Sequence, residues 1–433
     1  MTLALLAFLV VILLCFFGVR IGIATLFVGF MGVSLERSFN AGFTLVGQQV
    51  LEHAMNYNLS VIPLFILMGT FIHKSEVSLD LYHAAYAGLS KIRGGLAHST
   101  VIACAGFSAV CGSSLATAAT MTKVSMPPMQ KYNYSPSLAT GTIAAGGTLG
   151  IMIPPSVPLV IYGLVTQQDI GTLFMAGIIP GILLVLSFLL AVGIWTRINP
   201  DAAPSDDGSI DIISTKKSVR AVIPILLLFV LVLGGIYGRI FTPTEASGIG
   251  AFGAAIVALS RGYLSSWSQW REVLVDTTIS SASLFMVLFG ATIFMQYITL
   301  SGMPFELMYW VDDMNLSPMG LVLMITFISL LMGMVFEAIG ILLLIVPLFL
   351  PALEMAGVNM IWFAIIIVLV IELALITPPI GINVFVVNSM VKDIPIIKVF
   401  KGVLPFVLAM LVVLGLLLIW PNIVLFVPNL NPV

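Results

Sequence analysis

The chain has 433 residues, of which 60% are hydrophobic and 8% are charged. This composition, with a mean hydropathy of +1.16, is typical of a polytopic membrane protein. The 17 basic and 19 acidic residues almost cancel, which argues against a nucleic-acid-binding surface. The sequence contains no Walker loop, zinc-protease motif or nucleophile elbow. ATP hydrolysis and hydrolase chemistry therefore have no support, and we do not expect an enzyme.

The first part of the chain alternates short apolar runs with charged residues. A single helix from residue 3 to residue 35 would be about 50 Å long, too long for one crossing of a hydrocarbon core of about 30 Å. We therefore expect two short spans, separated by Gly18 and Arg20. The predicted elements are spans at 3–17, 21–35 and 59–72 and an interfacial helix at 36–58.

Residues 97–132 predict a re-entrant helical hairpin. Two modest apolar runs flank the stretch CGSSLATAAT, which consists almost entirely of small and hydroxylic residues. Basic residues end both arms, so we expect the chain to enter and leave by the same face and to turn at Gly112, Ser113 and Ser114. A helix–helix contact through small residues is the alternative interpretation.

Residues 137–168 predict a helix that is broken inside the membrane. The run is apolar and long enough to cross a bilayer, yet the stretch GGTLGIMIPPSVP contains three glycines and three prolines. Proline removes a backbone donor and clashes with the preceding turn, so Pro154 and Pro155 interrupt a continuous helix. Unwound backbone at this depth is tolerated only where it is buried in protein or lines a wet cavity. A proline-kinked packing helix is the alternative.

The second half of the chain repeats this plan after a hydrophilic segment at 199–219, which we interpret as a cytoplasmic linker. The stretch GMVFEAIG marks the tip of a second hairpin, and ELALITPPIGINVF carries a second proline pair. A span at 173–195 completes the first half. The predicted elements of the second half are spans at 221–237, 246–259 and 277–300, an interfacial helix at 261–276, a hairpin at 320–353, a broken helix at 361–387 and a last span at 402–427.

Rare residues recur with constant spacing in the two halves. A shift that places Pro154 on Pro378 also places Pro127 on Pro351. We interpret this as an all-α protein with two repeats, each with five transmembrane helices, one of them proline-broken, and one re-entrant hairpin. The repeats are residues 1–219, with scaffold helices within 3–72, and residues 220–433, with scaffold helices within 221–300.

The distribution of charge indicates the orientation of the repeats. An odd number of spans per repeat makes the two repeats inverted relative to each other. If the amino terminus is periplasmic, all of the 17 basic residues except Arg37 and Arg239 fall on the cytoplasmic side. The carboxyl terminus is then periplasmic as well. The histidines share no helical face, and we expect them at the interfaces.

If the hairpin tips and helix breaks meet near the middle of the membrane, they form a site lined by oxygens. Hard oxygen ligands without Cys or His suit an alkali cation better than a transition metal. Because the core has no obvious Lys or Arg outside Lys123, an anionic substrate would be held by helix N-termini and bound cations. The candidate residues are Gly112, Ser113, Ser114, Thr117, Gly147, Thr148, Pro154, Pro155, Ser156, Gly333, Glu337, Gly340, Thr377, Pro378, Pro379, Gly381 and Asn383. The candidate Na⁺ ligands among them are Ser113, Ser114, Gly147, Pro154, Gly333, Thr377 and Pro379.

Three acidic residues lie in apolar surroundings. Glu245 follows a Thr-Pro-Thr sequence and has the pattern of a helix N-terminal residue. Glu337 at the second tip and Glu372 shortly before Thr377 are functional candidates, because acids inside a membrane are costly. The alternative is that each of them holds a neighbouring backbone segment in place.

A resemblance to the large membrane subunit of tripartite ATP-independent periplasmic (TRAP) transporters covers nearly the whole chain. It is carried by the stretches CGSSLATAAT, AAGGTLGIMIPPSVPLVIYG, FTPTEAS, GMVFEAIGILLLIVPLFLPAL and ELALITPPIGINVFVVNSM. The resemblance implies an elevator-type secondary carrier of the bacterial inner membrane, in which a Na⁺ gradient drives uptake of an organic acid. It also implies two partners, a small four-helix membrane subunit and a periplasmic binding protein that delivers the substrate. Its Na⁺ sites would lie where hairpin tips meet helix breaks.

Two other functions stay open at this point. One is a stand-alone Na⁺/dicarboxylate carrier, which shares inverted repeats and hairpins. The other is a non-transporting membrane scaffold or an ion-pump subunit, in which Glu337 and Glu372 would relay protons. The substrate stays open among sialic acid, C4-dicarboxylates, other sugar acids and small sulfonates. Two or more Na⁺ ions and no organic cofactor are expected.

Overall fold

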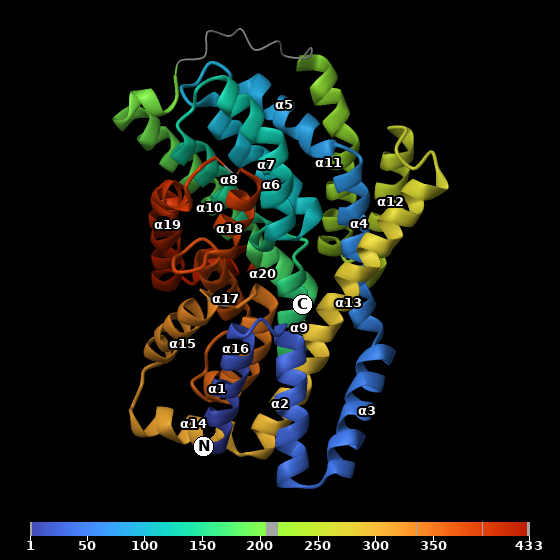
Figure 1. Ribbon diagram of the computed structural model, residues 1–433, viewed down its shortest axis with the longest axis vertical. Helices are drawn as coiled ribbons and strands as arrows, with labels where there is room; N and C mark the ends of the chain where they lie inside the picture. Colours follow the sequence, from blue (N-terminus) through green and yellow to red (C-terminus); the bar gives the residue numbers. More distant parts are fainter. Residues whose placement is uncertain (1, 205–214, 335, 392, 431–433) are drawn as a thin grey trace.

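The computed structural model describes residues 2–204, 215–334, 336–391 and 393–430 (Figure 1). The described residues form helices and loops without a strand. Six helices are long and apolar enough to cross a membrane, and a seventh crossing results if a bent pair counts as one span. The prediction of an all-α polytopic membrane protein is therefore confirmed. Part of the predicted linker, 205–214, lies outside the described residues.

The first half begins with short helices and continues into a hairpin and a broken helix. Its elements are α1 (Thr2–Phe16), α2 (Ile21–Glu36), α3 (Phe39–Met55), α4 (Val61–Lys74), α5 (Val77–Leu89), α6 (Gly95–Cys111), α7 (Ser114–Lys131), α8 (Pro136–Met152), α9 (Val157–Thr166) and α10 (Ile170–Ile198). α1 and α2 have 15 and 16 residues, about 22–24 Å each, which is less than a full membrane crossing.

The second half has the same sequence of short helices, hairpin and broken helix. Its elements are α11 (Thr215–Tyr237), α12 (Pro243–Ser260), α13 (Trp267–Leu300), α14 (Met303–Asp313), α15 (Pro318–Gly333), α16 (Ala338–Met355), α17 (Met360–Ala374), α18 (Ile382–Met390), α19 (Ile396–Ile419) and α20 (Asn422–Leu430). When the first half of the sequence is shifted so that Pro154 is aligned with Pro378, the first residue of α7 is aligned with the first residue of α16. The first residue of α8 likewise falls on that of α17.

The start of α12 shows how the sequence sets a helix boundary. Thr242 Oγ1 accepts a hydrogen bond from the Glu245 N–H (3.2 Å), and Glu245 Oε2 accepts one from the Thr242 N–H (2.9 Å). This capping box satisfies two backbone donors that the helix itself leaves unpaired. Glu245 therefore has the helix N-terminal role that its position in the sequence indicates.

Two predicted boundaries are wrong. The interfacial helix at 261–276 and the span at 277–300 form one continuous helix, α13, of 34 residues. No Gly or Pro occurs between Asp276 and Phe289 to stop it, whereas α3 and α4 are bent by 65° next to Asn56. The last span, expected at 402–427, ends at Ile419 because Pro421 cannot continue the helix, and α20 follows.

Helices α2, α4, α12 and α13 pack together on one side of the molecule, and we call them the scaffold (Figure 1). α13 lies against both α2 and α4, and α12 lies against α4. A Cβ atom on Gly29 would be 2.7 Å from the Phe294 backbone, so glycine permits the close approach of α2 and α13. Arg261, which follows α12, donates to the carbonyls of Ser75 and Ala221 (3.0 and 2.8 Å) and so connects α12 to its neighbours.

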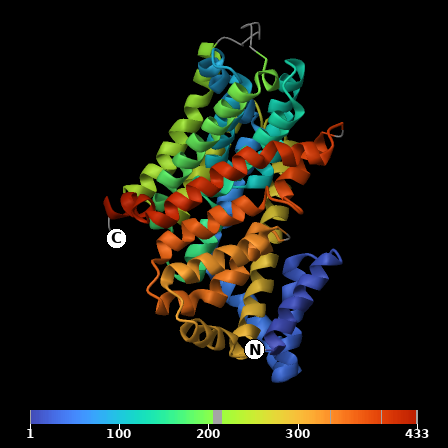
Figure 2. The same cartoon turned by 90° about the vertical axis from the view of Figure 1, so that its left-hand side faces the viewer.

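The hairpins and the broken helices form a second group, which we call the hairpin group. α8 contacts α6, α7 and α19, and α17 contacts α15, α16 and α19. The two broken helices also contact each other, since α17 packs against α8 and α9 and α18 packs against α8. Figure 2 shows α19 running obliquely across the face of this group. The fold therefore brings both helix breaks into one region.

Candidate functional site

Pro154 and Pro155 lie in the first break, residues 153–156, between α8 and α9. Neither has an N–H group, so the carbonyls of Gly150 and Ile151 one turn earlier receive no helical hydrogen bond. A serine at the end of the break caps α9 through a hydrogen bond of 3.4 Å. The break thus offers carbonyl oxygens on one side and a helix N-terminus on the other.

The tip of the first hairpin lies directly against this break. α6 ends at Cys111, and Gly112 turns the chain with a φ of +62°, a conformation that favours glycine. A Cβ atom on Gly112 would lie 3.0 Å from the Pro155 carbonyl oxygen. Ser113 then caps α7, its Oγ accepting from the Ala116 N–H. Tip and break are therefore in backbone contact.

Two glycines of α8 complete the contact. A Cβ atom on Gly150 would lie 2.8 Å from the carbonyl carbon and oxygen of Ser113, and one on Gly147 would lie 3.2 Å from the Ser114 carbonyl oxygen. These neighbours are backbone atoms, which cannot turn aside as the end of a side chain can. The structure thus brings the predicted residues of the first tip and the first break into one cluster, which we call the first junction.

The predicted hydroxyl residues of the first junction are buried. Ser114, Thr117, Thr148 and Ser156 are at most 4% exposed. Thr117 Oγ1 donates to the Ser113 carbonyl (2.8 Å), and Thr148 Oγ1 donates to the carbonyl of Ala145 (2.7 Å). A hydroxyl oxygen that donates its proton keeps its lone pairs. Each of these oxygens therefore remains able to coordinate a cation.

The second break, residues 375–381, separates α17 from α18. It contains the predicted site residues Thr377, Pro378, Pro379 and Gly381. Gly381 has a φ of +62°, again the region that favours glycine. The Asn383 N–H reaches back across the break to the Leu375 carbonyl (3.0 Å). The unwound segment is therefore a closed loop and not an extended strand.

The second hairpin meets this break at its own tip. Gly333 ends α15, and a Cβ atom there would lie 2.5 Å from the Ala374 side chain at the end of α17. Glu337 is exposed and extended at the start of α16 and accepts no capping hydrogen bond. Gly340 lies elsewhere, with Ile21 of α2 as the nearest neighbour of its missing Cβ. Gly333 therefore belongs to this second junction, whereas Gly340 lies at the contact with the scaffold.

Two buried side chains at the second junction have polar atoms without a hydrogen-bond partner among the described residues. These atoms are both carboxylate oxygens of Glu372 and the amide oxygen of Asn383, and both residues are 0% exposed. Asn383 donates its amide N–H to the Ala144 carbonyl of α8 (3.4 Å). The Glu372 carboxylate lies next to the backbone at the end of α8. Because an uncompensated buried charge or polar group is costly, the Glu372 carboxylate fits a bound cation or a proton, and the Asn383 amide oxygen fits a bound cation.

One cavity, of ≈ 950 Å³, reaches both tips, the second break and the residues that flank the first break, and we call it the central cavity. The hairpin group contributes Ser113 and Ser114 from the first tip, Glu337 from the second tip and Leu375 from the second break. The scaffold and the adjoining α1–α2 turn contribute polar residues from the other side. They are Arg20, Thr70, His73, Asp276, Ser280 and Ser283. The central cavity therefore lies between the scaffold and the hairpin group.

Arg20 is a functional candidate that the sequence analysis missed. It lies between α1 and α2 and is the one Lys or Arg among the described residues that line the central cavity. Lys123, the basic residue considered from the sequence, lines a different cavity. The lengths of α1 and α2 could have indicated this position of Arg20. Both helices are too short to cross the membrane, so the turn between them can lie at membrane depth.

An all-helical fold with several membrane-length helices, and with a cavity between a scaffold and two hairpins, is typical of polytopic membrane transport proteins. The sequence model of the family described as "Tripartite ATP-independent periplasmic transporter, DctM component" matches residues 2–423. The chain therefore belongs to this family, as the large membrane subunit of a TRAP transporter, and it is not an enzyme.

Individual relatives agree with this assignment. The chain is 34% identical over 382 residues to the C4-dicarboxylate TRAP transporter large permease protein DctM of Pseudomonas aeruginosa, covering 88% of each chain. It is 30% identical over 422 residues to the sialic acid TRAP transporter large permease protein SiaM of Vibrio cholerae, covering 96% of each. The crystal structure of the YdaH transporter of Alcanivorax borkumensis has a similar fold, with a TM-score of 0.66 and 16% identity over 88% of this chain and 87% of that chain.

Proposed function

We propose that this chain is the carrier subunit of a Na⁺-coupled importer of an organic acid anion. The observation that carries the proposal is the pair of buried residues with unpaired oxygens, Glu372 and Asn383, at a helix break that borders the same cavity as Arg20. A cation at the junction removes the cost of the buried oxygens. A guanidinium on the other wall complements a carboxylate. Together they suit the joint transport of a cation and an organic anion.

The donor atoms at the two junctions fit Na⁺, which is hard and prefers oxygen ligands. At the first junction the donors would be the hydroxyls of Ser113 and Ser114 and the carbonyls near Gly147 and Pro154. At the second junction they would be the carbonyls near Gly333 and Pro379, the Thr377 hydroxyl, and the side chains of Glu372 and Asn383. Two junctions support two or more Na⁺ ions per transport cycle.

The substrate class follows from the charge of the cavity and from the relatives. P. aeruginosa DctM and V. cholerae SiaM are named for C4-dicarboxylates and sialic acid, both of which are organic acids. In this chain Arg20 would bind one carboxylate as a bidentate partner. Other sugar acids and small sulfonates present a similar anionic group and belong to the same proposed class.

We further propose that the hairpin group moves against the scaffold as an elevator and carries the two junctions, which face the central cavity, across the membrane. The cavity between the two groups supports this motion. Two inverted repeats, 1–219 and 220–433, would supply it, since helix starts in both halves follow one constant shift. The charge distribution supports an inner-membrane protein with both termini in the periplasm.

Membership of the family supports two protein partners, a small four-helix membrane subunit and a periplasmic binding protein that delivers the anion. The direct test is reconstitution in liposomes with an imposed Na⁺ gradient. Uptake that requires Na⁺, the small subunit and the binding protein supports the proposal. Uptake by this chain alone would instead indicate a stand-alone carrier. Absence of uptake with every component present would favour a scaffold or ion-pump subunit.

The role of Arg20 is tested in the same assay. Replacing Arg20 by Gln removes the guanidinium from the central cavity, and charge-assisted hydrogen bonds of this kind are worth about 1.5–3 kcal/mol. The KM for the anion should therefore rise about tenfold or more. Arg37→Gln is the matched control, because Arg37 is exposed at the other end of α2, away from the cavity. Equal KM values for the two variants would remove Arg20 from the substrate site.

A further inference from the structure

Two cavities follow one another along the seam between the scaffold helix α4 and the hairpin helix α7. The central cavity is lined by Ser114 and Ala116 from the first turn of α7. A second cavity, of ≈ 540 Å³, is lined by Lys123 and Val124 further along the same helix. His73, near the end of α4, lines both cavities. The two cavities are therefore neighbours, and His73 lies at the boundary between them.

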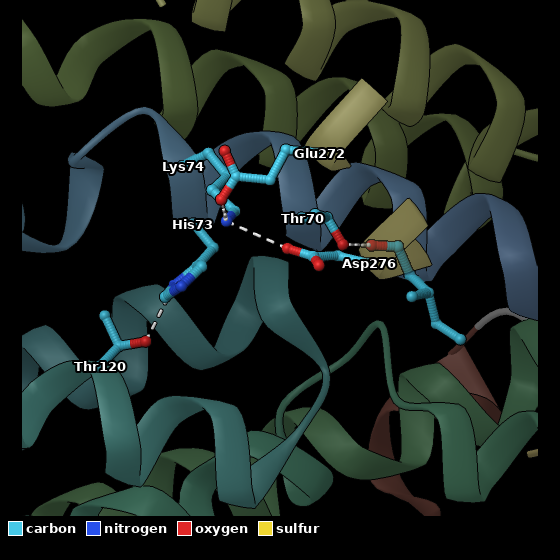
Figure 3. A network of polar contacts seen from close by, with 7 residues as sticks. Thr70, His73, Lys74, Thr120, Glu272 and Asp276 are labelled. Atoms are coloured by element: carbon cyan, nitrogen blue, oxygen red, sulfur yellow. Dashed lines mark hydrogen bonds and ion pairs between the residues drawn. The ribbon is translucent and has the colours of Figure 1, made fainter. Parts of the chain in front are cut away.

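A hydrogen bond crosses the seam at this boundary. It joins Thr120 Oγ1 of α7 to His73 Nδ1 of α4 at 2.9 Å (Figure 3). Thr120 is 6% exposed and lines the second cavity. The ring of Phe107 on α6 lies 6.2 Å from the His73 ring, so the imidazole is also in contact distance of the other arm of the hairpin. These side chains lie at the boundary between the two cavities.

The residue next to His73 is fixed within the scaffold. Lys74 Nζ lies 2.5 Å from Glu272 Oε1 and 3.0 Å from Asp276 Oδ2, both on α13 (Figure 3). This double ion pair fastens the end of α4 to α13. His73 therefore stays with the scaffold, and any motion of the hairpin group against the scaffold must break its bond to Thr120.

The second cavity has largely apolar walls that also carry several polar side chains. Besides Lys123 they include the hydroxyl residues Ser78 and Tyr82 and the imidazole of His83. Burial lowers the pKa of the His83 imidazole, which is then neutral at pH 7. Glu76 lines the same cavity, so its charge is balanced by Lys123. A wall with few charges of balanced sign lets an anion pass without trapping it.

We propose that the second cavity is the cytoplasmic vestibule of the transport path, and that His73 and Thr120 form the gate between it and the central cavity. While the bond is made, the two cavities are separate. When the hydrogen bond breaks, the two cavities join, and the organic acid anion leaves past Lys123. The identity of the passing anion rests on the proposed function, whereas the gate and the route can be tested without any substrate.

The gate is tested by the accessibility of the central cavity from the cytoplasmic side. Ser283 of α13 is exposed to the central cavity, so Ser283→Cys serves as the reporter in a protein whose three native cysteines are replaced by Ala. The rate of its reaction with a membrane-impermeant maleimide is measured in inside-out vesicles that contain the full transporter. Thr120→Val should raise this rate about threefold to tenfold, the range expected for one lost hydrogen bond.

Two further variants separate the gate from a general loosening of α7. Thr120→Ser restores the hydroxyl and should restore the reporter's original rate. Thr122→Val removes a hydroxyl that donates only within α7, to the Ala118 carbonyl (2.6 Å), and should leave the rate unchanged. The proposed gate would be wrong if Thr120→Val left the reaction rate of the reporter cysteine unchanged, or if Thr122→Val raised this rate as much as Thr120→Val does.

The route is tested by filling the second cavity. Val124→Trp places a large side chain in its wall and should slow the reaction of the reporter about tenfold or more. Ile182→Trp, at a position of α10 that is 55% exposed, controls for the bulk of the residue and should have no effect. An unchanged rate in Val124→Trp would show that another route reaches the central cavity. Failure of the proposed function would instead appear as absence of Na⁺-driven uptake by the unaltered transporter.

Discussion

The two junctions between a hairpin tip and a helix break are built by different means. At the first junction glycines bring backbone against backbone, and the hydroxyls of Thr117 and Thr148 are already hydrogen-bonded within their own helices. At the second junction Glu372 and Asn383 keep unpaired oxygens in the protein interior. The same sequence plan thus gives one junction that depends on shape and one that depends on charge. Substitutions should therefore affect the two junctions in opposite ways.

The largest effect is expected from added volume at the first junction. In Gly150→Ala the new Cβ would lie 2.8 Å from backbone atoms of Ser113, and overpacking of this kind costs about 1–3 kcal/mol. The melting temperature should fall by several degrees and Na⁺-dependent uptake should be lost. Gly340→Ala is the matched control, because its Cβ meets only the end of the Ile21 side chain. Equal melting temperatures for the two variants would contradict the backbone contact.

The second largest effect is expected from the charge at the second junction, and it has the opposite sign for stability. Glu372→Gln removes an unpaired buried carboxylate while keeping its volume, so stability without Na⁺ should be unchanged or higher. The additional stability that saturating Na⁺ confers should largely disappear, because a ligand stabilises only through the sites that it occupies. Thermal unfolding with and without Na⁺ measures both the stability of the Na⁺-free protein and the additional stability that Na⁺ confers. Glu354→Gln, on the exposed face of α16, should behave like the unaltered protein.

A smaller effect is expected from the neutral oxygen of the second junction. Asn383→Leu removes the amide oxygen and the hydrogen bond to the Ala144 carbonyl. One such group is worth about 1 kcal/mol, or more when it binds a charge. The Na⁺ concentration for half-maximal uptake should rise about fivefold to tenfold. A variant that inserts normally and keeps the original Na⁺ dependence would exclude Asn383 from the cation site.

The smallest effects are expected from single hydroxyls. Ser114→Ala at the first junction and Thr377→Val at the second each remove one candidate Na⁺ ligand with little change of volume. Each should raise the Na⁺ concentration for half-maximal uptake several-fold, while the melting temperature in the absence of Na⁺ stays within about two degrees. If neither variant shifts the Na⁺ titration, the hydroxyls serve only helix capping and local hydrogen bonding.

The sequence contained the local part of this architecture. Proline pairs mark helix breaks because the missing N–H acts on the nearest turn, and α8 and α17 do end within one turn before Pro154 and Pro378. A capping box likewise depends on residues three positions apart, so the role of Glu245 was predictable. These features need no knowledge of the rest of the fold.

Features that depend on distant parts of the chain were not predictable in the same way. The charge distribution predicts Arg20 on the cytoplasmic side, whereas its place in the central cavity depends on how the fold sets the α1–α2 turn opposite the hairpin tips. His73 was expected at an interface, although its bond to Thr120 connects two groups of helices. The continuity of α13 also escaped prediction, because a run of aromatic and charged residues fits both an interfacial helix and the first turns of a long span.

The most direct test of the central claim is the equilibrium binding of radioactive Na⁺ to the purified protein. If both junctions hold a cation, the unaltered protein should bind at least two Na⁺ ions per chain. Glu372→Gln should bind at least one fewer, because it removes the buried carboxylate that would hold the cation. The same number of bound ions in both proteins would contradict the assignment of a cation to the second junction.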